Sequence, residues 1–306
     1  MKISIIVASH NRSESLQMFL KSIENQKVPD GSDWEVLIVD NNSSDDTKDT
    51  TQLFIRRNPG KIRYIFEKKL GKSLALNSGI CAAHRDVLVF TDDDCIPDSG
   101  WLGAIVNEFA SDSSLFVLGG RVELYCKEDR PITIRTFRER ILFCSLDQLF
   151  SLIPGCNMAF RRSVFDAVGN FDPVLGPGTK VEAAEDIEFL YRVFKKGFKI
   201  VYCPDVLVYH NHGRRTDAQV QALNHKYVIG RGAFYCKYIL KADLSVLKMA
   251  YWEISSLIRG LLKERFSGEA AQKQKTLLRD LLIGAVYIPS ALRWHLGRRF
   301  VRRLPS

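Results

Sequence analysis

The cysteines of this sequence show neither a regular spacing nor the spacing of a metal-binding site. The seven that it has are an odd number, scattered from Cys81 to Cys236, and none belongs to a Cys-x-x-Cys pair. These features argue against a disulfide framework and against a zinc site, and they favour reduced thiols in a cytosolic setting.

Long hydrophobic runs are also missing. The apolar run at 3–8 is too short for the hydrophobic region of a signal peptide and is followed by His10, Asn11 and Arg12, so we expect a first strand there. The uncharged run at 281–292 has 12 residues, whereas a membrane-spanning helix needs about 20. With 46% hydrophobic and 26% charged residues, the composition is that of an ordinary globular protein, not of a disordered or collagen-like one.

Three consecutive aspartates, Asp92, Asp93 and Asp94, follow an apolar run at 87–90. The run predicts a buried strand, and the acids must lie at its end because a buried strand cannot hold three carboxylates without compensating cations. In an open α/β sheet, that end borders the ligand crevice. A cluster of hard oxygen ligands suits Mg²⁺ or Mn²⁺, which in turn suits phosphate. The alternative is a plain acidic turn.

Strands and helices alternate along the first part of the chain. Apolar runs predict strands at 3–9, 34–39 and 61–66, with helical spacing between them. This alternation favours right-handed crossovers and a mostly parallel sheet, so Asp40 at the end of the second strand lies at the same edge as the three aspartates. Lys72 stands at the start of a later helix. The glycine before it is not part of a P-loop frame, and a solvated lysine is the alternative there.

The second half of the pattern runs from 154 to 212. It predicts a strand at 154–162, a short helix at 163–169, a helix that begins at Glu185 and Asp186, and strands at 198–202 and 206–209 followed by His210 and His212. An acid pair at a helix start is also what capping and the helix dipole favour, and a histidine after a strand is most often structural. Between 125 and 151 no clean period emerges, and we expect a variable region.

A basic tail ends the sequence. Residues 221–306 contain 16 Lys and Arg against 5 Asp and Glu, while the rest of the chain has 28 against 30. Apolar residues at helical spacing, interspersed with cations, run through 244–262, and Trp294 and several arginines follow the uncharged run. Such helices suit the surface of an anionic membrane. Packing on the rest of the protein or dimerisation are the alternatives, and without a recognised module we expect no nucleic-acid partner.

Taken together, these runs resemble family 2 of the inverting nucleotide-sugar glycosyltransferases, which have the GT-A fold. The matching motifs occur in the family's order and cover roughly 1–212: Ser4–Val7 with Asn11 and Arg12, Val39–Asp45, Gly71–Asn77, Asp92–Asp94, Gly155–Arg162, Gly169–Asp172, Glu185–Asp186 and Tyr202–His210. The resemblance implies an α/β fold, with a Rossmann-like, mostly parallel sheet and helices on both faces. We expect a catalytic domain at 1–215, with a donor-binding half at 1–120 and an acceptor-side half at 121–215. A basic helical extension would follow at 216–306.

The resemblance also implies roles for single residues. Asp186 would be the general base, and Asp94 and His210 would bind the metal, with His212 a nearby competitor for His210. Asp40 would bind the nucleotide base and Asp92 the ribose. The other expected donor-binding residues are Ser9, Asn11, Arg12, Lys72, Asn77 and Asp93, and the expected acceptor-side residues are Trp101, Gly155, Asn157 and Glu185.

The chemistry requires these residue types independently of the resemblance. A departing nucleoside diphosphate gathers negative charge, which a divalent cation held by a carboxylate and an imidazole stabilises. The acceptor hydroxyl is a poor nucleophile until a positioned carboxylate takes its proton. A single displacement with one base inverts the anomeric carbon, whereas retention by double displacement needs a carboxylate nucleophile.

The sequence therefore predicts a glycosyltransferase that depends on Mn²⁺ or Mg²⁺. It would move a sugar from a UDP, GDP or dTDP sugar to a hydroxyl acceptor, lipid-linked or polysaccharide, in cell-envelope or exopolysaccharide synthesis. We expect it in the cytoplasm, peripheral on the inner face of the plasma membrane.

Three alternatives come from other classes. A sugar-phosphate nucleotidyltransferase should have a glycine-rich signature near its first strand, which 9–12 lacks, and an aspartyl phosphohydrolase should have its acids after that strand. A non-catalytic, nucleotide-sugar-binding scaffold stays open.

Overall fold

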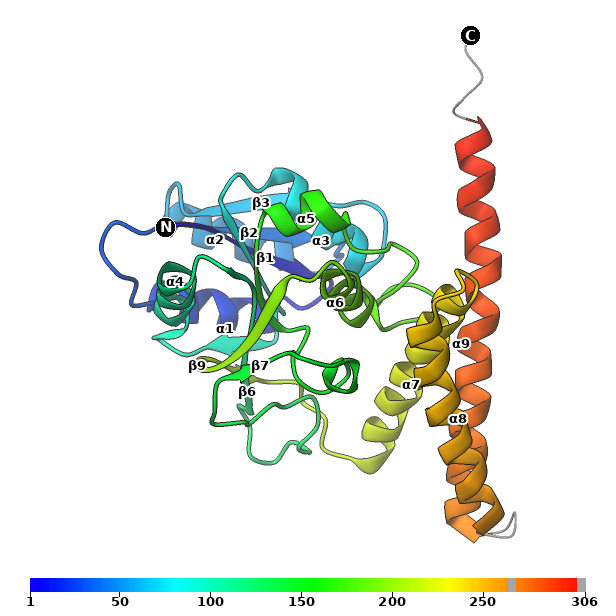
Figure 1. The fold of residues 1–306 in the computed structure, drawn as a ribbon. Coiled ribbons are helices and arrows are strands. Elements are labelled where there is room, and N and C mark those ends of the chain that lie inside the picture. The colour runs from blue at the N-terminus through cyan, green and yellow to red at the C-terminus, as the bar shows by residue number, and fades with distance from the viewer. Residues whose placement is uncertain (264–267, 302–306) are drawn as a thin grey trace. The chain divides into compact units, whose positions relative to one another are not determined.

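The computed structural model describes the backbone of residues 1–263 and 268–301 and the side chains of 1–263 and 268–288 (Figure 1). Trp294 and the arginines after it lie outside the described side chains. The described chain divides into two compact units. The first comprises 1–172 and 186–216, and the second comprises 173–185 and the helices from Asp217 onward.

The first unit is built on a nine-stranded sheet with the strand order β3-β2-β1-β4-β8-β6-β9-β5, and β7 pairs with β9. Its first four strands are parallel to one another. They are β1 (Lys2–Ser9), β2 (Asp33–Asp40), β3 (Ile62–Phe66) and β4 (Val87–Thr91). Because β1 and β2 pair in register from Lys2 with Asp33 to Ser9 with Asp40, their carboxyl ends meet at one edge.

Beyond β4 the sheet is mixed, because β8 runs antiparallel to both β4 and β6. These strands are β5 (Cys95–Pro97), β6 (Leu115–Leu124), β7 (Ile141–Leu142), β8 (Asn157–Arg161) and β9 (Lys199–His210). The two strands expected at 198–202 and 206–209 form one strand, β9, because a register shift against β6 accommodates Pro204, Asp205 and Val206. The aperiodic segment at 125–151 contains β7 and a single 3₁₀ turn, Leu146–Gln148.

Six helices belong to the part of the chain that forms or borders this sheet. They are α1 (Ser13–Glu24), α2 (Thr47–Arg57), α3 (Lys72–Ala82), α4 (Trp101–Ser111), α5 (Ser163–Val168) and α6 (Glu185–Lys195). Their apolar faces bury the core, as Leu16, Phe19, Leu20 and Ile23 of α1 do. On α3, a Cβ added to Gly79 would lie 2.5 Å from Ile6 Cγ2. This helix therefore packs on β1 more closely than alanine would allow.

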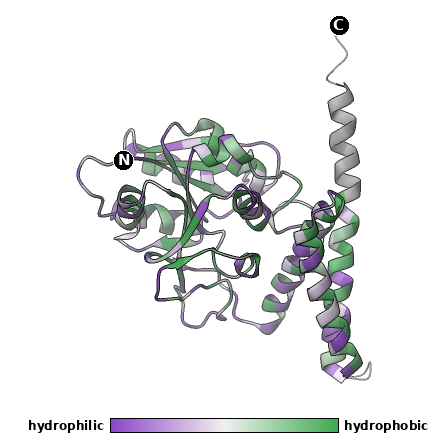
Figure 2. Cartoon of the chain, viewed as in Figure 1, coloured by the Kyte–Doolittle hydropathy of each residue, from purple (hydrophilic) through white to green (hydrophobic). Residues whose placement is uncertain are grey.

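The second unit contains α7 (Asp217–Ile239), α8 (Leu244–Lys263) and α9 (Gly268–Val301). Glycines bring α7 and α9 close together, since a Cβ on Gly232 would lie 2.0 Å from Leu281 O. Segment 173–185 packs with these helices through Leu175, Val181 and Ala233, a grouping that no pattern in the sequence indicated. Hydrophobic and hydrophilic residues are mixed along α7, α8 and the part of α9 that is coloured in Figure 2. Among the described residues, none of the helices combines the length and the apolar character that crossing a bilayer requires.

Candidate active site

The three aspartates lie where β4 ends, as the sequence predicted, and two of them are buried. Asp93 is 5% exposed and Asp94 is 7% exposed. The neighbouring strand β1 ends at Ser9, whose hydroxyl donates a 2.7 Å hydrogen bond to Asp93 Oδ2. The edge formed by the two parallel strands therefore holds a cluster of carboxylates at the start of the turn into β5.

Two cations partly neutralise this cluster. Arg12 Nη1 lies 2.6 Å from Asp94 Oδ2 and 3.4 Å from Asp93 Oδ1. Lys72 Nζ, from the first turn of α3, lies 2.5 Å from Asp92 Oδ1. Burial and the neighbouring Asp94 carboxylate raise the pKa of Asp93, although Arg12 and the Ser9 hydroxyl oppose that rise. One carboxylate of the cluster is thus held in an environment that favours its protonation.

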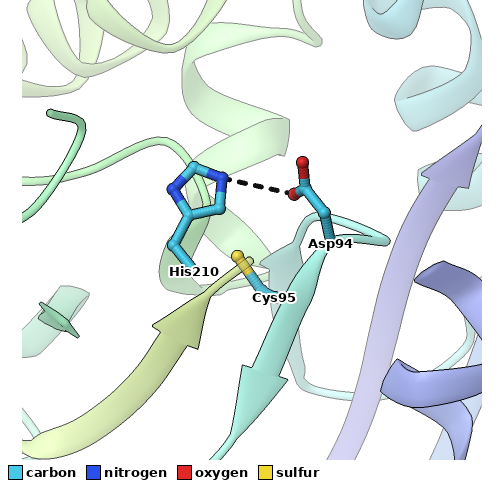
Figure 3. Close-up of side chains that lie close together, drawn as sticks. All are labelled: Asp94, Cys95 and His210. Carbon is cyan, nitrogen blue, oxygen red and sulfur yellow. Dashed lines mark ion pairs between the residues drawn. The ribbon is translucent and has the colours of Figure 1, made fainter. Parts of the chain in front are cut away.

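His210 reaches the cluster through the pairing of β5 with β9. That register sets His210 opposite Cys95, next to Asp94 in sequence. Figure 3 shows the imidazole and the Asp94 carboxylate pointing toward each other, with Nε2 and Oδ1 3.3 Å apart. Burial alone would lower the pKa of His210, but Asp94 outweighs it and raises the pKa to about 9. Burial opposes ionisation of Asp94, yet His210 and Arg12 hold its pKa well below the usual range.

His212, the competitor for the metal-binding role, makes other contacts. Its Nδ1 accepts a 3.0 Å hydrogen bond from the Arg214 amide and lies 3.5 Å from Asp129 Oδ2. Burial and the neighbouring His210 lower the pKa of this ring. The geometry therefore favours His210 over His212 as the imidazole that faces Asp94.

The donor atoms here fit a small divalent cation. Asp94, Cys95 and His210 offer ligand atoms that all lie within 4.8 Å of one another. Asp94 Oδ1 is buried and makes no hydrogen bond of good geometry, which leaves it able to bind a cation. The thiol of Cys95 interacts with Cys156, and that contact together with burial raises its pKa. A carboxylate and an imidazole beside a protonated thiol suit Mn²⁺ or Mg²⁺ better than a thiolate-bound metal.

Asp186, the second residue of α6, lies against the backbone of Gly155. A Cβ on that glycine would lie 2.2 Å from Asp186 Oδ2, so only glycine leaves room for the carboxylate. The Ile187 amide donates a 2.7 Å hydrogen bond to Asp186 Oδ1. Burial and the Asp92 charge raise the pKa of Asp186 against the opposing effects of that amide and Lys72. Because Lys72 and Asp92 act on it electrostatically, Asp186 belongs to the same region as the aspartate cluster.

Asp40 lies at the end of β2, where the sequence predicted it, and is 2% exposed. The Tyr64 hydroxyl donates a 2.6 Å hydrogen bond to Oδ2, and the Ser43 amide donates one of 2.8 Å to Oδ1. Asn11 adopts a left-handed backbone with φ of 52° and accepts a hydrogen bond from the Ser44 amide. These contacts hold the loops after β1 and β2 together.

Several of the expected site residues are buried or bonded within the fold. Trp101, expected on the acceptor side, has a fully buried ring, and its Nε1 donates a 2.9 Å hydrogen bond to Asn157 Oδ1. The Asn157 amide nitrogen in turn donates to two backbone carbonyls in the core. The side-chain amide of Asn77 donates a hydrogen bond to the backbone carbonyl of Phe171 and accepts one from the backbone N–H of the same residue. Glu185 is 7% exposed at the start of α6.

Two residues at the site were not predicted from the sequence. The sequence pattern places Tyr64 in a strand and indicates no role for its side chain. Its hydroxyl donates a hydrogen bond to Asp40, which lies on a neighbouring strand. Thr133, whose hydroxyl lies 3.0 Å from His210 Nδ1, belongs to the segment in which no period was found. Neither the strand pattern nor the loop composition carries a signal for these contacts.

The α/β fold, with aspartates, a lysine and a histidine gathered at one edge of its sheet, is the one expected of a GT-A-type glycosyltransferase. The model of the family described as "Glycosyl transferase family 2" matches residues 4–169, more than half of the chain, and the chain belongs to that family. The predicted family is thereby confirmed, and the α/β fold class agrees with it, although the sheet is mixed where a mostly parallel one was predicted.

Curated relatives agree with this assignment. The probable glycosyltransferase YdaM of Bacillus subtilis is 27% identical over 224 residues, which cover 68% of this chain and 50% of the relative. Glycosyltransferase AglE of Haloferax volcanii is 27% identical over 210 residues, which cover 68% of this chain and 66% of the relative. The chain thus spans between half and two thirds of the length of these two relatives.

Solved structures show the same fold. The mannosyltransferase PcManGT from Pyrobaculum calidifontis, in complex with GDP-Man and Mn²⁺, has a TM-score of 0.59 at 19% identity, covering 94% of this chain and 86% of that one. TarS 1-349 of S. aureus has a TM-score of 0.60 at 16% identity, covering 96% and 92%. At these identities the likeness concerns the fold alone.

The contact between His210 and Asp94 predicts a pH-dependent stability. Because folding raises the pKa of His210 from its ordinary value of 6.5 to about 9, the contact stabilises the fold fully below pH 6.5 and is lost as the pH rises through 9. In a buffer that contains a chelator, we expect the free energy of unfolding, measured in urea, to fall by on the order of 3 kcal/mol between pH 6.5 and pH 9. His210→Asn should remove most of this fall, and His84→Asn, at an exposed site, should keep it. An equal fall in all three proteins would contradict the assignment.

Proposed function

We propose that this chain is a metal-dependent, inverting glycosyltransferase that moves a sugar from a nucleotide diphosphate sugar to a hydroxyl acceptor. The observation that carries the proposal is the convergence of Asp94, His210 and the Lys72–Asp92 pair on one sheet edge, near a half-buried Asp186. Membership of glycosyl transferase family 2 supports the reaction class.

Asp94 Oδ1 and His210 Nε2 are the atoms that would hold the divalent cation. When bound, such a cation stabilises the negative charge that gathers on a departing diphosphate. Arg12 already pairs with the other oxygen of Asp94, so it fixes that carboxylate while leaving Oδ1 to the metal side. Lys72, held by Asp92 at the start of α3, adds positive charge where a diphosphate would lie.

Asp186 is proposed as the general base that takes the proton of the acceptor hydroxyl. Its raised pKa makes it a stronger base than an exposed aspartate. Gly155 keeps the carboxylate close to the backbone, and the Ile187 amide fixes one of its oxygens. The other oxygen, Oδ2, is then the one that accepts the proton, and attack from that side inverts the anomeric carbon.

The donor is proposed to be a UDP, GDP or dTDP sugar. Structures of the same fold have been solved with GDP-Man and Mn²⁺ and with UDP-GlcNAc, which supports this class of donor. Asp40, whose carboxylate is fixed by Tyr64 and Ser43 at the end of β2, is proposed to face the nucleotide base, with Asp92 near the ribose.

Metal dependence is tested by Asp94→Asn. Because this change removes the charge that would bind the cation, we expect donor turnover, measured as release of UDP, GDP or dTDP from a donor panel, to fall at least 100-fold. Removing metal from the wild type with a chelator should lower turnover to the same extent, and added Mn²⁺ should restore the turnover of the wild type. Turnover that survives both the substitution and the chelator would contradict the metal's role. A wild-type protein that binds the donor with Mn²⁺ but shows no turnover would favour a non-catalytic scaffold.

The base is tested by Asp186→Asn, which keeps the shape of the side chain. We expect the donor affinity, measured by calorimetry with Mn²⁺, to stay within about threefold of wild type while transfer falls by 10²-fold or more. Asp166→Asn, at an exposed position on α5, is the matched control and should transfer normally. Equal losses in binding and transfer would assign Asp186 to the donor site instead.

The acceptor is proposed to be lipid-linked and the protein peripheral on an anionic membrane, at the cytoplasmic face. A relative named GalNAc(5)-diNAcBac-PP-undecaprenol beta-1,3-glucosyltransferase, from Campylobacter jejuni, is 35% identical over 109 residues, which cover 35% of this chain and 34% of that relative. Its name describes a lipid-linked acceptor, and this supports the same class here.

An exposed apolar stripe on α8 supports the membrane contact. Its members recur at helical spacing: Leu244, Leu247, Tyr251, Ile254, Ile258 and Leu262. Leu244 is 76% exposed and Tyr251 is 61% exposed. At about 100° per residue, three exposed lysines and arginines, Lys248, Arg259 and Lys263, lie along one edge of the stripe. An apolar stripe edged by cations suits the interface of an anionic bilayer.

The membrane contact is tested by Leu247→Glu combined with Tyr251→Glu. Loss of two apolar contacts, together with new like charges, should lower binding to phosphatidylglycerol vesicles by at least 10-fold in co-sedimentation. Ser256→Glu, on the opposite side of α8, adds a charge without touching the stripe and should change binding less than threefold. Unchanged binding by the double variant, or no binding by the wild type, would contradict the proposal.

A further inference from the structure

Thr133 has an unusual backbone conformation beside the proposed metal site. Its φ is 57°, in the left-handed region that branched side chains rarely enter. A conformation of this kind is strained and persists only where the surroundings enforce it. The side chain that it directs inward is a hydroxyl next to His210.

The hydrogen bonds of this hydroxyl determine where its proton lies. Thr133 Oγ1 is 2.6 Å from the carbonyl oxygen of Ile132 and 3.0 Å from His210 Nδ1. A carbonyl can only accept, and two oxygens this close repel unless a proton lies between them. The hydroxyl therefore donates to Ile132 and has only lone pairs left for the histidine.

His210 must then donate from Nδ1 to the threonine oxygen. A neutral imidazole with its proton on Nδ1 has its lone pair on Nε2, which is the atom that faces Asp94 Oδ1. In proteins, a histidine that binds a metal through one nitrogen usually donates the other N–H to a fixed acceptor. Thr133 is such an acceptor for His210.

We propose that Thr133 is a positioning residue that selects the Nδ1–H form of His210 and aims its Nε2 at the divalent cation. This inference rests on the proposed metal dependence and deepens it. It assigns a function to a residue in the segment between β6 and β7 that neither the sequence pattern nor the resemblance singled out.

The backbone on both sides of Thr133 is fixed to the strands that carry the site. Before it, the Arg130 amide donates a 2.8 Å hydrogen bond to Arg214 O, four residues after His210. After it, Arg135 and Val122 exchange two backbone hydrogen bonds of 2.9 Å. The segment is thus tied to β6 on one side and to the chain leaving β9 on the other.

A buried carboxylate strengthens the first of these ties. Asp129 is 3% exposed, and its two oxygens accept hydrogen bonds from the Gly213 amide at 2.9 Å and from Arg215 Nε at 3.2 Å. Because these donors lie three and five residues after His210, their hydrogen bonds fix the loop to the segment that follows the histidine. The surroundings therefore hold Thr133 in its strained conformation.

The experiment measures the affinity for Mn²⁺ alone, by the electron paramagnetic resonance signal of free Mn²⁺, and needs no turnover. Thr133→Val keeps the branched shape but removes the acceptor oxygen, so the Kd should rise about 10- to 100-fold. Thr133→Ser keeps the hydroxyl and should stay within about threefold of wild type. Thr136→Val, an exposed position in the same segment, is the matched control and should bind as wild type does.

Thr133→Gly separates positioning from folding. Glycine adopts a φ of 57° without strain, so this variant should unfold at a urea concentration at or above that of the wild type. It should nevertheless lose Mn²⁺ affinity as the valine variant does. A folded glycine variant that binds Mn²⁺ like the wild type would overturn the inference, as would a serine variant that fails to bind.

The outcome for the wild type separates this inference from the proposed function. If wild type binds Mn²⁺ and the His210→Asn variant does not, but the valine and glycine variants bind normally, the role of Thr133 alone is overturned. If wild type does not bind Mn²⁺ at all, the proposed metal dependence is overturned, and the role of Thr133 with it.

Discussion

The repulsion among three adjacent carboxylates at the end of β4 is the constraint on which the rest of the site depends. Two unit charges roughly 4 Å apart repel by about 4 kcal/mol at an effective dielectric constant of 20. Asp93 and Asp94 are nearly buried, so solvent screens them little. Arg12, Lys72 and His210 are the groups through which this chain offsets that cost, and each comes from a different element. We propose that this concentration of charge at the sheet edge serves to bind a cation and the phosphates that accompany it.

The fold brings these groups together through strand register. Parallel pairing of β1 with β2 and β4 aligns the ends of the three strands, so Ser9, Asp40 and Asp92 all lie at one edge. Antiparallel pairing of β5 with β9 then returns a histidine from a distant part of the chain to the same edge. A close helix contact at Gly79 places α3 on β1, and the first turn of that helix carries Lys72. The chemistry therefore depends on backbone pairing that lies outside the site itself.

Much of this edge could be predicted because its signals are local. An apolar run that stops at acids identifies both β4 and its end, and the same pattern identifies β2 with Asp40. The positions of Trp101 and Asn157 could not be predicted, because the two residues lie 56 positions apart in the sequence and meet only in the folded protein, where both are buried. The three-residue strand β5, which contains a proline, has no detectable pattern. Thr133 escaped prediction because its conformation is imposed by tertiary contacts against the preference of its own side chain.

The central claim is that Asp94 and His210 bind one divalent cation that in turn contacts a diphosphate. Anomalous diffraction from crystals grown with Mn²⁺ and a nucleoside diphosphate tests it most directly. The account predicts a single strong manganese peak within coordination distance of both Asp94 Oδ1 and His210 Nε2, with phosphate oxygens completing the shell. A manganese peak remote from these two atoms, or a bound diphosphate with no manganese beside the aspartates, would contradict it.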